Sequence, residues 1–167
     1  MVACGRAAIT TPHYGPWILV CLVAGACPAC DSQVATSSAC DGFADRTTGI
    51  LGSEYRSCAR AILSQLDTLE QRLRPLTSGD TTSLSDAQDP YRHARKLIRH
   101  TGIERDYRSR NAAGLQRWPE AVVRSFNEAA WGAVVQWGSA IGSGSVGNFV
   151  EGRRQYVDAR RLYEYVR

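Results

Sequence analysis

Cysteines are the residues of this 167-residue sequence whose chemistry is easiest to recognise, and there are six of them. Cys27 and Cys30 form a C-x-x-C pair, a spacing that occurs in thiol–disulfide oxidoreductases and in zinc sites. No strand followed by a helix accompanies the pair, and Cys40 and Cys58 stand singly rather than as a second pair of zinc ligands. Asp31 occupies the position at which haem attachment requires histidine. The pair therefore favours neither a redox centre nor a zinc or haem site.

The segment that precedes Cys27 predicts a cleaved signal peptide over residues 1–26. Residues 17–26 are uncharged and mostly apolar, and they are only about half as long as the roughly 20 residues that cross a bilayer as a helix. Arg6 precedes this run, and residues 24–26 supply the small side chains that a signal peptidase requires. The sequence thus predicts an exported protein.

Residues 24–27 (AGAC) resemble a bacterial lipobox, in which the cysteine is acylated and becomes the first residue of the mature chain. The resemblance implies lipid attachment at Cys27, at the outer membrane or in the periplasm; secretion after cleavage before Cys27 is the alternative. In an oxidising compartment we expect Cys40 and Cys58 to form a disulfide. On the chain-entropy model, closing a loop of this size stabilises the folded state by about 3 kcal/mol.

An all-α domain is predicted over residues 53–167, behind a flexible tether at residues 27–52. The tether mixes small, polar and glycine residues without a sustained period. Residues 53–76 predict the first helix, in which apolar residues alternate in steps of four and three. These residues are Tyr55, Ala59, Ile62, Leu66, Leu69, Leu73 and Leu76. The heptad stripe indicates the seam of an antiparallel bundle, and the alternative is a homo-oligomer formed through residues 55–76.

Three further helices are predicted after a polar linker at residues 77–88. Asp89 followed by Pro90 is typical of a helix start, and Gly102 is a candidate C-cap for that helix. The later boundaries are a start at Trp118–Glu120, a hinge at residues 142–147 and a capping box of Asn148 and Glu151. No strand-like alternation is present, so the sequence predicts a small bundle of about four helices.

Histidines and carboxylates give little indication of an enzyme. His93 and His100 lie seven residues apart, with Glu104 four residues further on. Two helical turns separate ligands by about 10 Å, which is too far for one ion to bridge. The motifs of nucleotide-binding proteins, serine hydrolases and di-iron carboxylate proteins are missing from the sequence. We therefore expect a non-enzymatic protein with neither a metal nor a cofactor.

The charges of the chain are segregated. Residues 27–89 carry five arginines and nine acids, a net charge of −4, whereas residues 90–167 carry fourteen basic and seven acidic groups, a net charge of +7. The densest basic cluster, on the second predicted helix, consists of Arg92, Arg95, Lys96 and Arg99. This asymmetry is compatible with an anionic partner, recognised by the basic second and fourth helices; the alternative is a set of solvated helix faces, partly paired between the two halves of the chain. The expected function is a structural or binding role in the bacterial envelope.

Two alternative functions remain open. Residues 129–150 carry no charge and contain the G-x-x-x-G pair Gly138 and Gly142. This pattern is compatible with a membrane-active or oligomerising protein that uses the third helix. The polar residues of this stretch favour close helix packing in the bundle instead. If the leader is not processed, the alternative is a cytosolic basic protein that binds nucleic acid; an exported protein would not meet nucleic acid.

Overall fold

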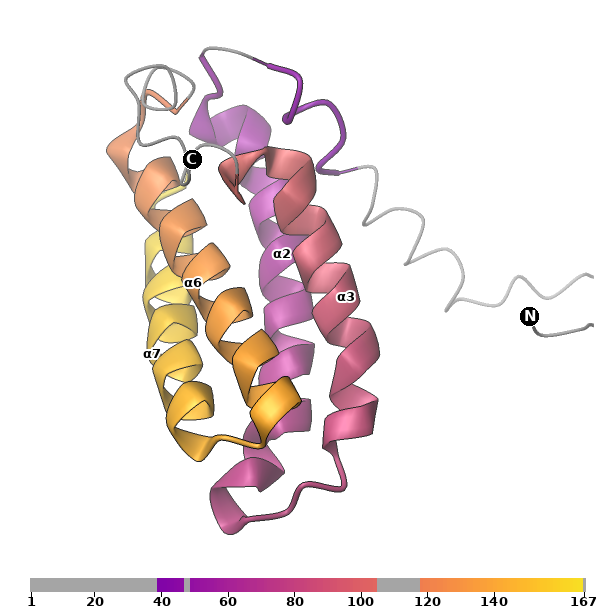
Figure 1. The fold of residues 1–167 in the computed structure, drawn as a ribbon. Helices are drawn as coiled ribbons and strands as arrows, with labels where there is room; N and C mark the ends of the chain where they lie inside the picture. Colours follow the sequence, from indigo (N-terminus) through magenta and orange to yellow (C-terminus); the bar gives the residue numbers. More distant parts are fainter. Residues whose placement is uncertain (1–38, 47–48, 105–117, 167) are drawn as a thin grey trace, which may run out of the picture.

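A computed structural model of the chain describes residues 39–46, 49–104 and 118–166. This part of the chain contains no strand, and its helices are α2 (Gly52–Leu73), the short 3₁₀ helix η1 (Arg74–Ser78), α3 (Leu84–Thr101), α6 (Ala121–Ser143) and α7 (Val146–Tyr163). Consecutive α-helices run antiparallel and form a four-helix bundle (Figure 1). The all-α prediction is confirmed. The predicted leader, Cys27 and Cys30 lie outside the described residues.

The four helices are arranged as a rhombus. α2 and α6 contact each other across its short diagonal, while α3 and α7 occupy the two far corners (Figure 1). The heptad stripe of the first helix lies in the middle, and each of its residues is at most 1% exposed. The stripe is therefore the seam of the bundle, and association with a second copy through residues 55–76 would require the bundle to open.

The start of α3 differs from the sequence-based prediction. The helix begins at Leu84, so Pro90 lies inside it, and the helix occupies the last five of the twelve residues of the predicted linker. Ala87 is fully buried and Leu84 is packed against the core, and this tertiary contact stabilises the turns before the proline. Proline removes one helical hydrogen bond, which the packing of the amphipathic face offsets. The predicted C-cap is confirmed, since Gly102 has a φ of 75°.

The predicted hinge at residues 142–147 is shorter in the structure. α6 continues to Ser143, Gly144 adopts a φ of 66° as its C-cap, and Ser145 is the N-cap of α7. The Ser145 hydroxyl accepts a hydrogen bond from the backbone N–H of Asn148. Asn148 is thus inside the helix, and the prediction that it is the cap was wrong. Ser145 serves as the cap instead, because its hydroxyl satisfies a backbone N–H of the first turn that has no partner within the helix.

The N-terminal segment packs onto the bundle before α2 begins. Cys40 and Cys58 form the predicted disulfide. Phe43 lies edge-on to Tyr55, with 5.3 Å between the ring centroids, and Ile50 is fully buried. The packed part of the chain therefore extends N-terminally beyond the domain boundary predicted at residue 53.

Glycines allow α6 to approach its neighbours closely. A Cβ atom at Gly152 of α7 would lie 2.4 Å from the Trp137 indole of α6, and one at Gly138 would lie 2.6 Å from the Tyr91 hydroxyl of α3. The Trp137 Nε1–H donates a hydrogen bond to the Phe149 carbonyl at 3.1 Å. Gly138 of the third helix thus serves a contact within the bundle, whereas a Cβ atom at Gly142 would have no neighbouring atom within 4 Å.

Replacing Gly152 with alanine should destabilise the protein because the added methyl group overlaps a fully buried indole. We expect a loss of about 1–3 kcal/mol in the free energy of unfolding, measured by urea titration with circular dichroism. Gly142 is the matched control, since a Cβ atom added there would have no neighbouring atom within 4 Å. Gly142→Ala should be neutral or stabilise the helix by up to about 1 kcal/mol. Equal effects of the two substitutions would contradict this account.

Candidate functional site

The basic cluster predicted on the second helix forms one stripe along α3. Arg92, Arg95, Lys96 and Arg99 follow one another at intervals of three, one and three residues, so they share the side of α3 opposite its buried residues. Three of the four are exposed, and Arg95 is half-buried. The side chain of Arg92 is 70% exposed and lies 3.7 Å from Asp89, and Arg99 lies 3.2 Å from Glu104. We call these four residues the α3 basic face.

The histidines of α3 do not come together as metal ligands. His100 Nδ1 lies 2.8 Å from the Asp41 carboxylate in the N-terminal segment, and His93 is exposed two turns away. Within residues 39–46, 49–104 and 118–166, no group of three or more histidine, cysteine or acidic side chains is close enough to hold an ion. His100 instead helps to hold the segment that carries Cys40.

A second concentration of arginines lies between α2 and α7. A groove of about 440 Å³ runs along these helices, and we call it the arginine groove. Its lining residues are Glu70, Arg74, Arg153, Tyr156, Val157, Arg160, Arg161 and Glu164. Four cations therefore face two carboxylates along the groove.

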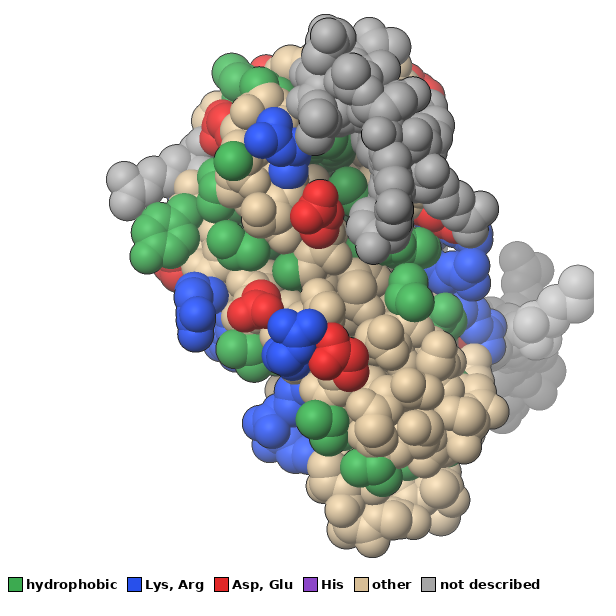
Figure 2. Space-filling model, turned by 60° about the vertical axis from the view of Figure 1, so that its left-hand side comes forward, with side chains coloured by type: hydrophobic (Ala, Val, Ile, Leu, Met, Phe, Trp, Pro, Cys, Tyr) green, Lys and Arg blue, Asp and Glu red, His purple; other side chains and the backbone are tan. Residues whose placement is uncertain are grey.

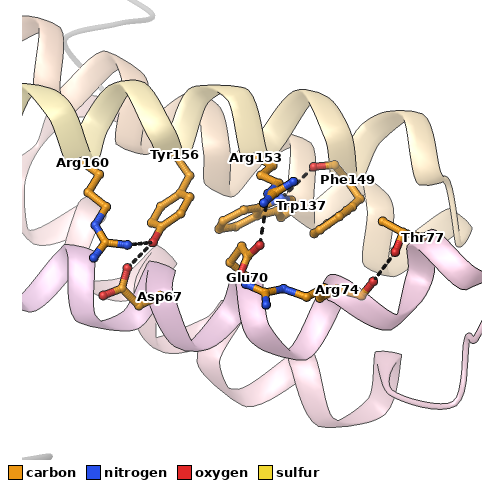
Figure 3. Close-up of polar contacts among 9 residues, drawn as sticks. All are labelled: Asp67, Glu70, Arg74, Thr77, Trp137, Phe149, Arg153, Tyr156 and Arg160. Atoms are coloured by element: carbon orange, nitrogen blue, oxygen red, sulfur yellow. Dashed lines mark hydrogen bonds and ion pairs between the residues drawn. The ribbon is translucent and has the colours of Figure 1, made fainter.

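Glu70 is the buried charge of the arginine groove, with only 6% of its side chain exposed. Arg74, the first residue of η1, donates a hydrogen bond to one carboxylate oxygen at 2.8 Å. Arg153 of α7 lies 3.2 Å from the other oxygen, so Glu70 joins the two helices (Figure 3). A buried carboxylate requires such pairing, because an unpaired charge would be strongly destabilising.

Tyr156 forms the second polar connection between α7 and α2. Its hydroxyl donates a hydrogen bond to Asp67 and accepts one from Arg160 at 3.1 Å (Figure 3). Burial, followed by the hydrogen bond to Asp67, raises the pKa of Tyr156. The phenol is therefore held protonated at neutral pH, as a donor that fixes Asp67 and orients the Arg160 guanidinium.

The chemistry that these two regions can perform is the binding of anions. In the arginine groove Glu70 is buried at the helix interface and Glu164 is exposed, while the long arginine side chains reach the surface; the Arg74 and Arg153 side chains are 64% and 58% exposed. The Nε of Arg153 is the atom of this side chain nearest to Glu70, at 3.2 Å from the carboxylate. Guanidinium groups fixed at one edge can bind a phosphate or carboxylate at the other.

The sequence did not identify the residues of the arginine groove, although a weak signal for them exists. Asp67 and Glu70 each directly follow a leucine of the heptad stripe, a position that faces a neighbouring helix. Arg153 and Arg160 are seven residues apart and share one side of α7. The helix that packs beside these residues cannot be deduced from spacing alone.

Comparisons with models of protein families, with curated proteins and with solved structures give no match to this chain. Among the described residues, no helix combines the length and the apolar character that a membrane-spanning helix needs. The function must therefore be argued from the surfaces described above.

Tyr156→Phe should lower the free energy of unfolding by about 1–3 kcal/mol, because Asp67 and Arg160 lose a buried hydrogen-bond partner. Tyr165→Phe is the matched control, since Tyr165 is 64% exposed. The folded-state pKa of Tyr156 is raised, so its stabilising contribution is complete below the unfolded value of about 10 and is lost as the pH rises through the folded pKa. The difference between wild type and Tyr156→Phe should therefore shrink above about pH 10. If the difference in unfolding free energy between wild type and Tyr156→Phe stayed constant up to about pH 12, well above the tyrosine pKa of the unfolded chain, this role would be contradicted.

Proposed function

We propose that this chain is an exported, non-enzymatic helical module of the bacterial envelope that binds an anionic partner through the α3 basic face. In this proposal a lipid on Cys27 anchors the mature chain, and the four-helix bundle presents the basic face to the partner. The observation that carries the proposal is the gathering of four cations on the outward side of α3, where Asp89 and Glu104 are the carboxylates paired with Arg92 and Arg99.

The Cys40–Cys58 disulfide supports the exported location over the cytosolic alternative. Both cysteines are fully buried, so the bond is an integral part of the core at the N-terminal end of α2. Disulfides of this structural kind persist in oxidising compartments and are rare in the cytosol. A nucleic-acid partner is correspondingly less favoured than an anionic polymer or headgroup of the envelope.

The position of α3 in the bundle supports an independent binding surface. α3 and α7 occupy opposite corners of the rhombus, so the basic residues of the second and fourth helices form two surfaces rather than one (Figure 1). A partner on the α3 basic face therefore need not contact the arginine groove. This separation allows the two surfaces to be tested independently.

Export and anchoring are tested by intact mass and fractionation of the full chain made in a bacterial host. We expect the wild type to lose the leader, gain the mass of acyl chains and sediment with membranes. The Cys27→Ser variant should lack the acyl mass and should leave the membrane fraction. An unprocessed chain in the cytosol would contradict the proposed location.

The binding role is tested with inorganic polyphosphate as the anionic probe. Replacing Arg92, Arg95 and Arg99 together with glutamine should weaken binding about tenfold, since each charge contributes about 0.5 kcal/mol. Binding by the wild type should also weaken as salt is added, because exposed charges are screened. The control removes the same number of charges elsewhere, as Arg46→Gln, Arg72→Gln and Arg154→Gln, none of which lines the arginine groove. Equal losses in both triple variants would mean that only net charge matters, which would contradict a specific face.

A further inference from the structure

The outer side of α7 carries an unusual concentration of exposed apolar side chains. Val146, Val150 and Val157 are 41%, 55% and 45% exposed. In the described part of the chain only three other large apolar residues are comparably exposed: Leu51, Val135 and Tyr165. Steps of four and seven residues place the three valines along one line of the helix, and we call them the valine ridge.

Arginines flank the valine ridge on both sides. Arg153 and Arg160 lie on the side of α2, where they contact Glu70 and Tyr156. Arg154 and Arg161 lie on the other side; Arg161 lines both the arginine groove and a cavity of about 620 Å³ between α6 and α7. The apolar ridge therefore lies between two pairs of guanidinium groups.

Three of the four carboxylates near the ridge are paired with its flanking arginines. Glu70 is buried beneath Arg153. Glu151 is held ionised by Arg154 and Gln155, whose hydrogen bonds lower its pKa to about 2, and Asp158 lies 3.7 Å from Arg154. Glu164 is the exposed acid at the end of the ridge. Figure 2 turns the left-hand side of Figure 1 forward and shows hydrophobic side chains interspersed with basic and acidic ones there.

We propose that the valine ridge and its flanking arginines form a contact surface for an anionic lipid bilayer. Valines can enter the boundary between headgroups and acyl chains, while arginines keep their apolar stems beside them and place guanidinium groups among the phosphates. A second copy of this face is a poorer fit, because like-charged arginines would meet at its rim. Since α3 lies at the opposite corner, a bilayer on α7 leaves the α3 basic face directed away from the membrane.

The test is co-sedimentation of the full chain with vesicles of phosphatidylcholine, alone or mixed with phosphatidylglycerol. The ridge variant replaces Val150 and Val157 with glutamine, and the matched control replaces Val135 and Leu51, which are 43% and 46% exposed on other parts of the surface. Both variants keep every charge and the same residues 1–50. Thermal unfolding monitored by circular dichroism verifies that each variant is folded.

We expect the wild type to bind mixed vesicles more tightly than neutral ones. The ridge variant should bind mixed vesicles about tenfold more weakly than the wild type, because about half of each of the two valine side chains is exposed in the free protein and would be buried in the lipid. The control variant should bind like the wild type. Equal binding by both variants would overturn the proposal, because the valines would then make no contact with lipid. Self-association in the absence of vesicles that only the ridge variant loses would also overturn it, and would identify a second copy as the occupant.

The polyphosphate experiment and the vesicle experiment test different surfaces, so either proposal can be contradicted without the other. The ridge variant keeps the α3 basic face, so its affinity for polyphosphate should be unchanged. The variant lacking Arg92, Arg95 and Arg99 keeps the valine ridge, so it should still bind mixed vesicles like the wild type. If that variant lost vesicle binding instead, α3 rather than α7 would face the lipid, and the assignment of α7 would be wrong.

Discussion

The fit of the Trp137 indole against Gly152 is the contact on which the arrangement of α6 and α7 depends. The indole is fully buried, its ring lies 5.6 Å from that of Tyr156, and its N–H donates to the backbone of α7. Any side chain larger than hydrogen at position 152 would displace it. Because protein cores are close-packed, this contact fixes both the distance and the register of α7 on α6.

The polar contacts between α7 and α2 follow from that register. Once Tyr156 lies against the indole, its hydroxyl reaches Asp67, and Arg153 three residues earlier lies above Glu70. The buried carboxylate and the phenol then orient Arg153 and Arg160 from below. In this way an apolar contact in the core determines where guanidinium groups emerge at the surface, and it separates that surface from the α3 basic face.

The amino-acid pattern predicted those features that depend on local chemistry. The stripe from Tyr55 to Leu76 predicted the central helix, Gly102 predicted a helix end, and Cys40 and Cys58 predicted the disulfide. The start of α3 was missed because packing of Leu84 and Ala87 outweighs the disruption caused by Pro90. The role of Glu70 was missed because it depends on Arg153, which lies in a helix far away in the sequence. Spacing within one helix carries no information about the helix beside it.

A double-mutant cycle between Gly152→Ala and Tyr156→Phe tests the central claim most directly. If the contact at Gly152 positions Tyr156, the alanine variant already weakens the hydrogen bond to Asp67, so the phenylalanine substitution has less left to remove. The account predicts that the combined loss of unfolding free energy is smaller than the sum of the two single losses by more than about 0.5 kcal/mol. Losses that add within experimental error would show that the Trp137 contact and the polar contacts to α2 are independent, which would contradict the account.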